Sequence, residues 1–336
     1  MERITMTNRS GASVSLITYG GTLVSIRVPD RQGALGDICL GYDTLADYEQ
    51  NGGYLGALVG RYANRIARGH LEVDGKTYQL ACNEGPNHLH GGTVGYDKKV
   101  WRADCQEQEE SDSVALTYTS PNLEENFPGA LQICATYTWN DENELTLHYR
   151  AVSDAATVIN LTNHAYFNLR GHAAGQITGH QIAILADKFT PVDAQCLPTG
   201  QLWDVTDTPF DLRELKTIGD GLALTGSNEQ LGFGQGYDHN FVLSKDEGVR
   251  KACELYDPAS GRIMETFTDL PGIQFYAGNM LNVPTPAKDG ARYSQRCGLC
   301  LETQFFPDSP NQPAFPTCVY AAGQVYDKTT VYKFSV

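Results

Sequence analysis

Basic residues are scarce in this 336-residue chain, and they form no run. The 25 Lys and Arg residues are outnumbered by 40 Asp and Glu residues, which gives a net charge of −15 with neutral histidines. Nucleic acid and anionic membranes would be repelled over most of such a surface. A phosphorylated ligand is disfavoured for the same reason, although a local arginine cluster would override the net field. The composition therefore predicts a small neutral ligand and no nucleic-acid or membrane partner.

Long apolar segments and a cysteine framework are also missing. Residues 1–10 contain no apolar signal-peptide core, and no window reaches the roughly 20 apolar residues that span a bilayer. The nine cysteines are an odd and scattered set, which favours reduced thiols in a reducing compartment. Cys297 and Cys300 form a lone CxxC pair, for which we predict neither a zinc nor a redox role. These absences predict a cytoplasmic protein.

Sustained helical periodicity, fixed-length repeats and linker segments are absent, and short strands take their place. Residues 12–19 and 22–28 alternate apolar and polar positions on either side of a Gly-Gly pair. The pair Asp74-Gly75, between two alternating runs, is a strong hairpin signal. One short helix is expected at 44–50. Further strands are predicted over Val114–Thr119, Ala135–Trp139, Glu144–Ala151, Gln181–Leu185, Ile263–Thr268 and Val331–Phe334.

These strands predict an all-β fold, with 34 glycines and 15 prolines available for tight turns. We expect one large antiparallel β-sandwich domain over residues 1–336, with few short helices. The acidic segment 106–112 is expected to be a solvated hairpin loop. An antiparallel sheet can leave one concave face open to a ligand.

The segment 160–169 places a histidine, His164, among three asparagines and two aromatic residues. Side chains alternate along a strand, so Thr162, His164 and Tyr166 would share one face. That face suits a polyhydroxylated ligand, because hydroxyls need donors and acceptors and sugar C–H faces need aromatic cover. The alternative is a core histidine whose two ring nitrogens are satisfied by neighbours, which is the commoner role of a lone histidine.

The segment Gly60–Ile66 contains two arginines four residues apart, with Asn64 beside the second. As a strand it would place Arg61 and Arg65 on one face. We expect Arg61 to lie at a solvated edge, so the segment alone is weak evidence for a site.

The loop 83–92 carries His88 and His90 two residues apart, a spacing that also suits metal ligands. A metal ion would need a third ligand, such as His164 or Glu302. Without one, the loop presents imidazole donors to a ligand.

Three polar residues in the C-terminal half interrupt apolar runs. Asp238 stands at a strand entrance, where a carboxylate is either a turn cap or an acceptor for two vicinal sugar hydroxyls. Gln274 lies inside an apolar run and therefore needs a partner or a ligand. Partial burial of Glu302 would raise its pKa toward the working pH and make it a general base, whereas a surface ion pair is the alternative.

In their order along the chain, these motifs resemble those of the aldose 1-epimerase (galactose mutarotase) family, and the resemblance covers essentially the whole chain. The segments that carry it are Gly60–Ile66, Pro86–Gly92, Asn160–Leu169, Tyr237–Phe241, Gly272–Tyr276 and Leu301–Gln304. The resemblance implies a large antiparallel β-sandwich with its site in an open cleft. It also implies a reaction that needs no metal and no cofactor.

The resemblance further implies that Glu302 is the general base and His164 the general acid. Together they would interconvert the α- and β-anomers of a free hexose such as galactose or glucose, by opening and closing the ring. The chain departs from the family pattern at His88 and over 122–128, which leaves the preferred sugar open. The residues implied to hold the sugar hydroxyls and the ring oxygen are Asn64, Arg65, His90, Asp238 and Gln274.

Three rival hypotheses stay open at this point. A carbohydrate-binding or sensor protein of the same fold would need neither a base nor an acid poised near neutrality. A hexose-6-phosphate 1-epimerase would need a basic cluster, which the net charge does not indicate. A metal-dependent sugar isomerase would use His88, His90 and Glu302. The sequence does not distinguish a monomer from a homodimer.

Overall fold

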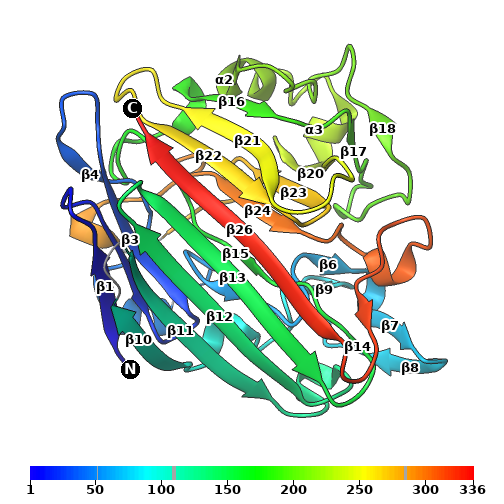
Figure 1. Cartoon of the computed structure of the whole chain (residues 1–336). Helices are drawn as coiled ribbons and strands as arrows, with labels where there is room; N and C mark the ends of the chain where they lie inside the picture. Colours follow the sequence, from blue (N-terminus) through cyan, green and yellow to red (C-terminus); the bar gives the residue numbers. More distant parts are fainter. Residues whose placement is uncertain (51, 108–110, 284–285) are drawn as a thin grey trace.

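The computed structural model describes residues 1–50, 52–107, 111–283 and 286–336, and its core is a β-sandwich (Figure 1). The larger layer is a nine-stranded sheet in which every pairing is antiparallel. Its strands in spatial order are β10 (Arg102–Glu107), β11 (Ser111–Ser120), β12 (Leu131–Asn140), β13 (Glu144–Ser153), β26 (Val325–Ser335), β22 (Ile263–Thr268), β21 (Arg250–Tyr256), β16 (Gln181–Ile184) and β19 (Lys216–Thr217).

The alternation of residue types explains why these strands form and which face they bury. Along β12, Leu131, Ile133 and Ala135 are buried, whereas Gln132 is exposed. Because successive side chains of a strand point to opposite faces, this period of two places one apolar face on the core. The sheet thus forms the wall on which the second layer packs.

The second layer, a five-stranded antiparallel sheet, carries several of the predicted site residues. Its strands in spatial order are β18 (Trp203–Asp204), β17 (Lys188–Phe189), β20 (Asp238–Val242), β23 (Gly272–Tyr276) and β24 (Cys300–Gln304). In the register of these strands, Gln274 lies directly opposite Glu302, and Asp238 lies opposite Tyr276. Directly opposite residues share a face, as do residues two apart, so all four side chains project from the same face.

Smaller elements complete the fold. A four-stranded sheet consists of β1 (Arg3–Thr7), β2 (Ser13–Ile17), β3 (Thr22–Pro29) and β4 (Leu35–Asp37). The two-stranded pairs are β5 (Leu58–Val59) with β15 (Thr162–Asn163), β6 (Arg65–Ile66) with β9 (His88–Leu89), β7 (His70–Val73) with β8 (Lys76–Gln79), and β14 (Thr157–Val158) with β25 (Val319–Tyr320). The α-helices are α1 (Leu45–Gln50), α2 (Ile218–Leu222) and α3 (Glu229–Phe233).

The predicted all-β antiparallel class is confirmed, as are the local signals behind it. The hairpin expected at Asp74-Gly75 joins β7 to β8, and both residues have the positive φ, 51° and 69°, that a primed two-residue turn needs. The short helix expected at 44–50 is α1. The acidic segment 106–112 was expected to be a loop, but residues 106–107 belong to β10 and residues 111–112 to β11, and these strands pair up to Glu107 and Asp112. Residues 108–110 lie outside the described residues.

The expectation of a solvated Arg61 is wrong. Its side chain is buried, and Nη1 donates to the carbonyl oxygens of Pro128, at 2.7 Å, and Gly129, at 2.9 Å. Nη2 donates to Oγ of Ser120 at 2.6 Å. These acceptors are about 60 residues away in sequence, so nothing in the local pattern of Gly60–Ile66 announces them. The guanidinium thus connects the loop before β6 to the end of β11 and the loop that precedes β12.

Two further observations concern the helices and the cysteines. None of the helices among the described residues has the length and apolar content of a membrane span. None of the nine cysteines is paired in a disulfide in the structure.

Candidate active site

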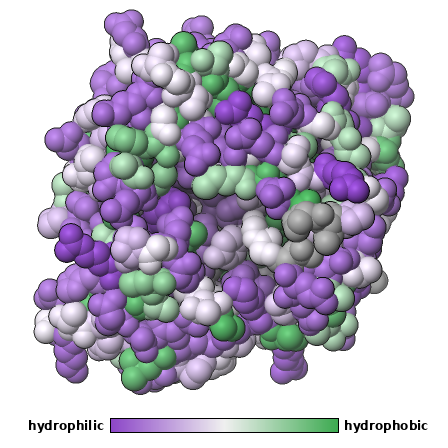
Figure 2. Space-filling view, turned by 180° about the vertical axis from the view of Figure 1, so that it is seen from behind, coloured by the Kyte–Doolittle hydropathy of each residue, from purple (hydrophilic) through white to green (hydrophobic). Residues whose placement is uncertain are grey.

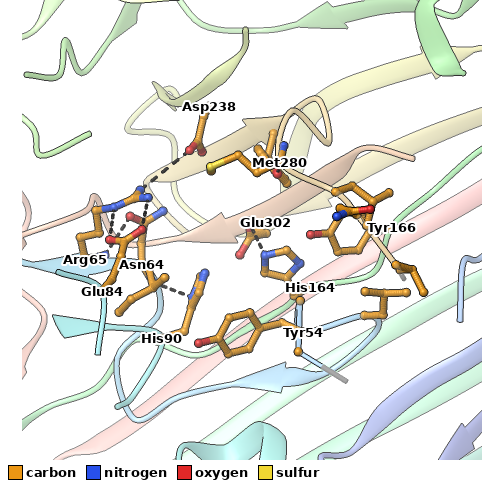
Figure 3. A pocket seen from close by; sticks show the side chains of 18 of the residues that line it. Tyr54, Asn64, Arg65, Glu84, His90, His164, Tyr166, Asp238, Met280 and Glu302 are labelled. Carbon is orange, nitrogen blue, oxygen red and sulfur yellow. Dashed lines mark hydrogen bonds and ion pairs between the residues drawn. The ribbon is translucent and has the colours of Figure 1, made fainter. Parts of the chain in front are cut away.

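An open cleft with a volume of about 510 Å³ lies against β20, β23 and β24, and the surface is hollowed near the middle of the face seen in Figure 2. Its walls come from segments far apart in the chain: residues 52–55, 64–65, 280–283 and the ends of several strands. Figure 3 shows side chains from these segments turned toward one shared space. Six of the seven predicted site residues line this cleft: Asn64, Arg65, His90, His164, Asp238 and Glu302.

His164 reaches the cleft from an extended segment beside β5. Only Thr162–Asn163 forms a ladder there, so the predicted strand is shorter than expected. His164 nevertheless stays extended, because its N–H donates to the carbonyl of Ala57 at 2.8 Å and its carbonyl accepts from Gly56 at 3.0 Å. The ring of Tyr166 packs beside the imidazole, with the centroids 5.1 Å apart. Thr162 is buried but is not among the residues that line the cleft.

The three asparagines of the segment 160–169 form hydrogen bonds to backbone groups of the protein. Asn160 donates to the carbonyls of Ala63 and Phe305 and accepts from the N–H of Phe305. Asn163 donates to the carbonyl of Gly56 at 2.9 Å, and its Oδ1 accepts from the N–H of Ala165 at 3.0 Å. The segment thereby fixes the backbone on both sides of His164.

The imidazole of His164 and the carboxylate of Glu302 face each other across the floor of the cleft (Figure 3). Nε2 of His164 lies 3.7 Å from Oε1 of Glu302, and both side chains are almost fully buried. Nδ1 of His164 contacts Sγ of Cys300 at 3.4 Å. An acid and a base therefore stand side by side, with Nε2 as the ring nitrogen that faces the cleft.

Burial moves the pKa values of this pair in opposite directions. It lowers the pKa of His164 to about 4, because the charged imidazolium is poorly solvated in the protein interior. It raises the pKa of Glu302 well above the ordinary value; the nearby charge of Asp238 adds to this rise and the charge of Arg65 opposes it. In the free site, neither member of the pair therefore favours its charged form.

The proton on His90 has a position that the backbone dictates. The N–H of Asn64 donates to Nδ1 of His90 at 3.1 Å, so Nδ1 carries a lone pair and the proton of the neutral ring sits on Nε2. Burial lowers the pKa of His90 well below its usual value, and the nearby His164 and Arg65 lower it further. His90 is therefore a fixed hydrogen-bond donor to whatever occupies the cleft.

This tautomer bears on the metal hypothesis. His90, His164 and Glu302 are three potential ligands whose donor atoms lie within 4.8 Å of one another. A metal ion on Nε2 of His90 would force the ring proton onto Nδ1, against the N–H of Asn64. His88 lies outside this trio, since its Nδ1 is 2.9 Å from the carbonyl of Ala81 and its ring packs against Phe127. The donor set is thus a poor fit to a metal ion.

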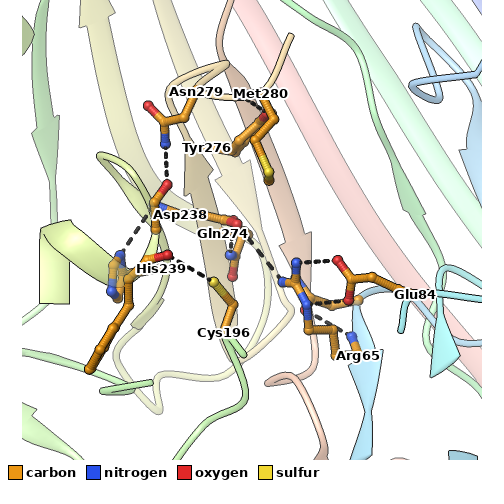
Figure 4. A network of polar contacts seen from close by, with 12 residues as sticks. Arg65, Glu84, Cys196, Asp238, His239, Gln274, Tyr276, Asn279 and Met280 are labelled. Carbon is orange, nitrogen blue, oxygen red and sulfur yellow. Dashed lines mark hydrogen bonds and ion pairs between the residues drawn. The ribbon is translucent and has the colours of Figure 1, made fainter. Parts of the chain in front are cut away.

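Arg65 joins the two sides of the cleft through a chain of polar contacts (Figure 4). Its Nε and Nη2 each donate to a carboxylate oxygen of Glu84 at 2.7 Å, and its Nη1 lies 3.9 Å from Oδ2 of Asp238. Burial alone would lower the pKa of Arg65, but the charges of Asp238 and Glu84 outweigh it and hold the value above the ordinary one. Gln274 donates to Oδ1 of Asp238 at 2.7 Å. Gln274 therefore supports Asp238 from the same face of the sheet, although it is not among the residues that line the cleft.

Glu84 is a site residue that the sequence did not single out, although it lies in the loop that carries His88 and His90. Nothing local distinguishes it from a solvated loop carboxylate, because its partner Arg65 precedes it by 19 residues. The aromatic side chains of Tyr54 and Tyr276 also line the cleft, and the sequence did not single them out. A useful signal would have been the need of the buried Arg65 for a carboxylate.

The charges in the cleft favour a neutral ligand. Among the lining residues that the structure describes, Arg65 is the one cationic side chain, and it is flanked by Glu84 and Asp238. Glu302 adds a third carboxyl group. A phosphate group would meet this acidic set with no unpaired cation to bind it.

Comparisons with known proteins agree with this geometry. A family model described as aldose 1-epimerase matches residues 2–333. The chain belongs to the aldose 1-epimerase family. It is accordingly an enzyme of the isomerase class, and the carbohydrate-binding and phosphosugar hypotheses are not favoured.

Relatives of this aldose 1-epimerase family member match over nearly their whole length. The chain is 44% identical to galactose mutarotase of Homo sapiens, over 96% of this chain and 91% of the relative. It is 35% identical to aldose 1-epimerase of Escherichia coli, over 98% and 94%. An aldose epimerase homologue from C. elegans superimposes with a TM-score of 0.90 at 32% identity, covering 99% of this chain and 98% of the other. The galactose 1-epimerase structure from Lactobacillus acidophilus gives 0.85 at 30% identity, covering 99% and 94%.

Proposed function

We propose that this protein interconverts the α- and β-anomers of a free aldose, with Glu302 as general base and His164 as general acid. The observation that carries the proposal is the buried approach of His164 Nε2 to Glu302 Oε1, at 3.7 Å, inside a cleft lined by hydrogen-bonding groups. One carboxylate and one imidazole are sufficient for ring opening and closure. The chemistry calls for no metal and no cofactor.

The reaction begins from the state in which the pair holds one proton. The opposite pKa shifts of Glu302 and His164 favour protonated Glu302 and neutral His164 before the sugar binds. Transfer of that proton across the pair gives a Glu302 carboxylate and a His164 imidazolium without exchange with solvent. A bound aldose stabilises this ion-pair form, because its C1 hydroxyl donates to the carboxylate and its ring oxygen accepts from the imidazolium.

Ring opening then moves two protons. Glu302 removes the proton of the C1 hydroxyl as the bond between C1 and the ring oxygen breaks, and His164 delivers its proton to the ring oxygen. The product is the open-chain aldehyde. Rotation about the C1–C2 bond presents the other face of the aldehyde, and the two transfers run backwards. Each transfer contributes about 10² to 10⁴-fold.

The remaining residues hold the sugar in place. His90 donates from Nε2, Arg65 donates from Nη1 toward the ring oxygen, and Asp238 accepts from sugar hydroxyls. Asn64 shapes the site in two ways. Its backbone N–H sets the His90 tautomer, and its side-chain Oδ1 accepts from the N–H of Arg65 at 2.8 Å. Gln274 holds Asp238 through its hydrogen bond to Oδ1.

The sugar, the assembly and the compartment are also proposals. Galactose is the first substrate to test, because the mammalian relatives are named galactose mutarotases, and glucose is the second. We propose a single domain over residues 1–336, active as a monomer or a homodimer in the cytoplasm, where the nine free thiols would stay reduced.

Polarimetry tests the activity directly. Freshly dissolved α-D-galactose or α-D-glucose is expected to reach its equilibrium rotation faster with catalytic amounts of the protein than in buffer alone. The matched control is the Glu302→Gln protein at the same concentration. The proposal fails if none of galactose, glucose, xylose and arabinose equilibrates faster with the wild-type protein than with this control.

A further inference from the structure

The carboxylate of Glu84 is held rigidly at the rim of the cleft. Its side chain is about one-third exposed, yet both of its oxygens are 2.7 Å from nitrogen atoms of Arg65. Its backbone is fixed by two hydrogen bonds with Asn87, one from each N–H to the other's carbonyl, at 3.0 and 2.9 Å. A paired contact of this kind fixes the plane of the guanidinium as well as its position.

Arg65 has a second carboxylate within reach, but it does not hydrogen-bond to it. Nη1 lies 3.9 Å from Oδ2 of Asp238, a distance at which charges attract but no hydrogen bond forms. Asp238 instead accepts one hydrogen bond, from Gln274 to Oδ1 at 2.7 Å. Among the described residues, Oδ2 of Asp238 accepts no hydrogen bond (Figure 4).

A buried guanidinium that lost Glu84 would seek its other partner. Arg65 is 5% exposed and Asp238 is 7% exposed, so an unpaired charge on either is costly. A closure of about 1 Å would bring Nη1 to hydrogen-bond distance from Oδ2. Such a closure would occupy the oxygen of Asp238 that is free for a sugar hydroxyl.

We propose that Glu84 is a positioning residue that holds Nε and Nη2 of Arg65, and thereby keeps Nη1 turned to the sugar and Asp238 free to accept sugar hydroxyls. The inference rests on the proposed function and deepens it. Glu84 acts through Arg65 and does not take part in the proton transfers. Of the two carboxylates beside Arg65, Glu84 thus holds the guanidinium and Asp238 remains free to bind the sugar.

The same contact shapes the electrostatics at Glu302. The charge of Arg65 lowers the pKa of Glu302, while Asp238 raises it. Glu84 offsets part of the charge of Arg65 where the two side chains meet. His90 and His164 face Glu302 and are neutral in the free site.

Four further titratable groups act on or are acted on by Glu302, and all of them stay neutral. Burial raises the pKa of each above its ordinary value. These groups are Tyr166, Tyr276, Cys300 and Tyr332. Removal of the Glu84 charge therefore leaves Arg65 as the group whose effect on Glu302 grows. The free site then loses the single proton of the pair, which Glu302 holds, at lower pH, so the basic limb of kcat/KM moves to lower pH.

Glu84→Gln tests the proposal, with Glu72→Gln as the matched control. Glu72 is an exposed carboxylate on β7, so its substitution removes the same charge from a neighbouring hairpin without touching the cleft. We expect Glu84→Gln to lower kcat/KM by roughly 10- to 100-fold, with KM rising more than kcat falls, and to shift the basic limb to lower pH. Glu72→Gln is expected to match the wild type in all three measurements.

Two further measurements test whether Glu84 acts on sugar binding through Arg65. Isothermal titration calorimetry with galactose is expected to show a Kd at least ten-fold higher for Glu84→Gln than for Glu72→Gln. In an Arg65→Met background, Glu84→Gln is expected to have no further effect on either Kd or the basic limb, because its target is gone. A melting curve checks that each variant is folded.

The outcomes separate this inference from the proposed function. A Glu84→Gln protein that binds galactose as tightly as Glu72→Gln overturns the role of Glu84. So does an equally large loss of binding in the Arg65→Met background, because Glu84 would then act by another route. A wild-type protein that binds galactose but does not accelerate its mutarotation refutes the proposed function alone, since the calorimetric comparison still reports on Glu84.

Discussion

The two ring nitrogens of His90 have separate roles, and two substitutions can separate them. Nδ1 accepts the N–H of Asn64 at 3.1 Å, whereas Nε2 carries the proton and serves the cleft. In His90→Asn, the side-chain oxygen takes about the place of Nδ1, so the acceptor is kept and the donor is lost. In His90→Gln, the amide nitrogen reaches about as far as Nε2, so the donor is kept and the acceptor is lost.

The structure gives the size of each loss. His90→Gln leaves the buried N–H of Asn64 without a partner, at about 1–3 kcal/mol. With an unfolding entropy of about 2.1 cal/mol/K per residue, 336 residues give about 0.7 kcal/mol/K, so Tm falls by about 1–4 °C. His90 has φ of 50°, a conformation that Asn adopts more readily than Gln, which widens the difference.

The activity should change in the opposite order. His90→Asn is expected to melt close to the wild type but to lose one hydrogen bond to the sugar, about 0.5–1.5 kcal/mol or about 2- to 13-fold in kcat/KM. His90→Gln should keep more of kcat/KM than His90→Asn does. Calorimetric melting and polarimetry on the same preparations measure both effects. If His90→Asn melts as low as His90→Gln, or keeps more kcat/KM, then Nδ1 is not the acceptor and the tautomer is wrong.

The other predictions concern the roles of Glu302 and His164, the support of His164 by Asn163, and the effect of Glu302 on the melting temperature. Glu302→Gln and His164→Asn should each lose about 10² to 10⁴-fold in kcat with an unchanged circular dichroism spectrum; full kcat in either variant would contradict the roles assigned. Asn163→Ala should lower kcat more than it raises KM in steady-state polarimetry, because Asn163 holds the backbone on both sides of His164. The raised pKa of Glu302 means that its favourable contribution is complete below the unfolded value near 4.5 and is lost as pH rises through the folded value. Glu302→Gln should therefore raise Tm relative to the wild type at pH 8 more than at pH 4, and an equal Tm difference at the two pH values would rule out a raised pKa.

The sequence predicted the class of the fold because strand alternation is a local property. The buried period along β12 and the positive φ of Asp74 and Gly75 follow from residues that are neighbours in the chain. The order of strands in the larger sheet does not. β26 lies between β13 and β22, so residues 144–153 pair with residues 325–335, and no local signal specifies that partner.

The site divides in the same way. Histidine and carboxylate positions could be read from motifs, and their resemblance to a family assigned roles to them. The contacts that set those roles are remote: Glu84 for Arg65, Cys300 for His164, and the N–H of Asn64 for His90. Arg61 was misjudged because its acceptors, such as Ser120, lie in another part of the chain.

Both imidazoles of the cleft have a protein partner at Nδ1. In each ring the protein occupies Nδ1: a backbone N–H donates to His90, and Cys300 contacts His164 at 3.4 Å. Burial raises the pKa of the Cys300 thiol well above its ordinary value, so the thiol stays neutral and its sulfur can accept the proton on Nδ1 of neutral His164. Nε2 of His90 then carries its proton toward the sugar as a fixed donor, whereas Nε2 of neutral His164 has a lone pair that takes the proton of Glu302, and His164 thereby becomes the acid. What distinguishes them is the carboxylate of Glu302, which lies 3.7 Å from Nε2 of His164 and makes that proton the mobile one.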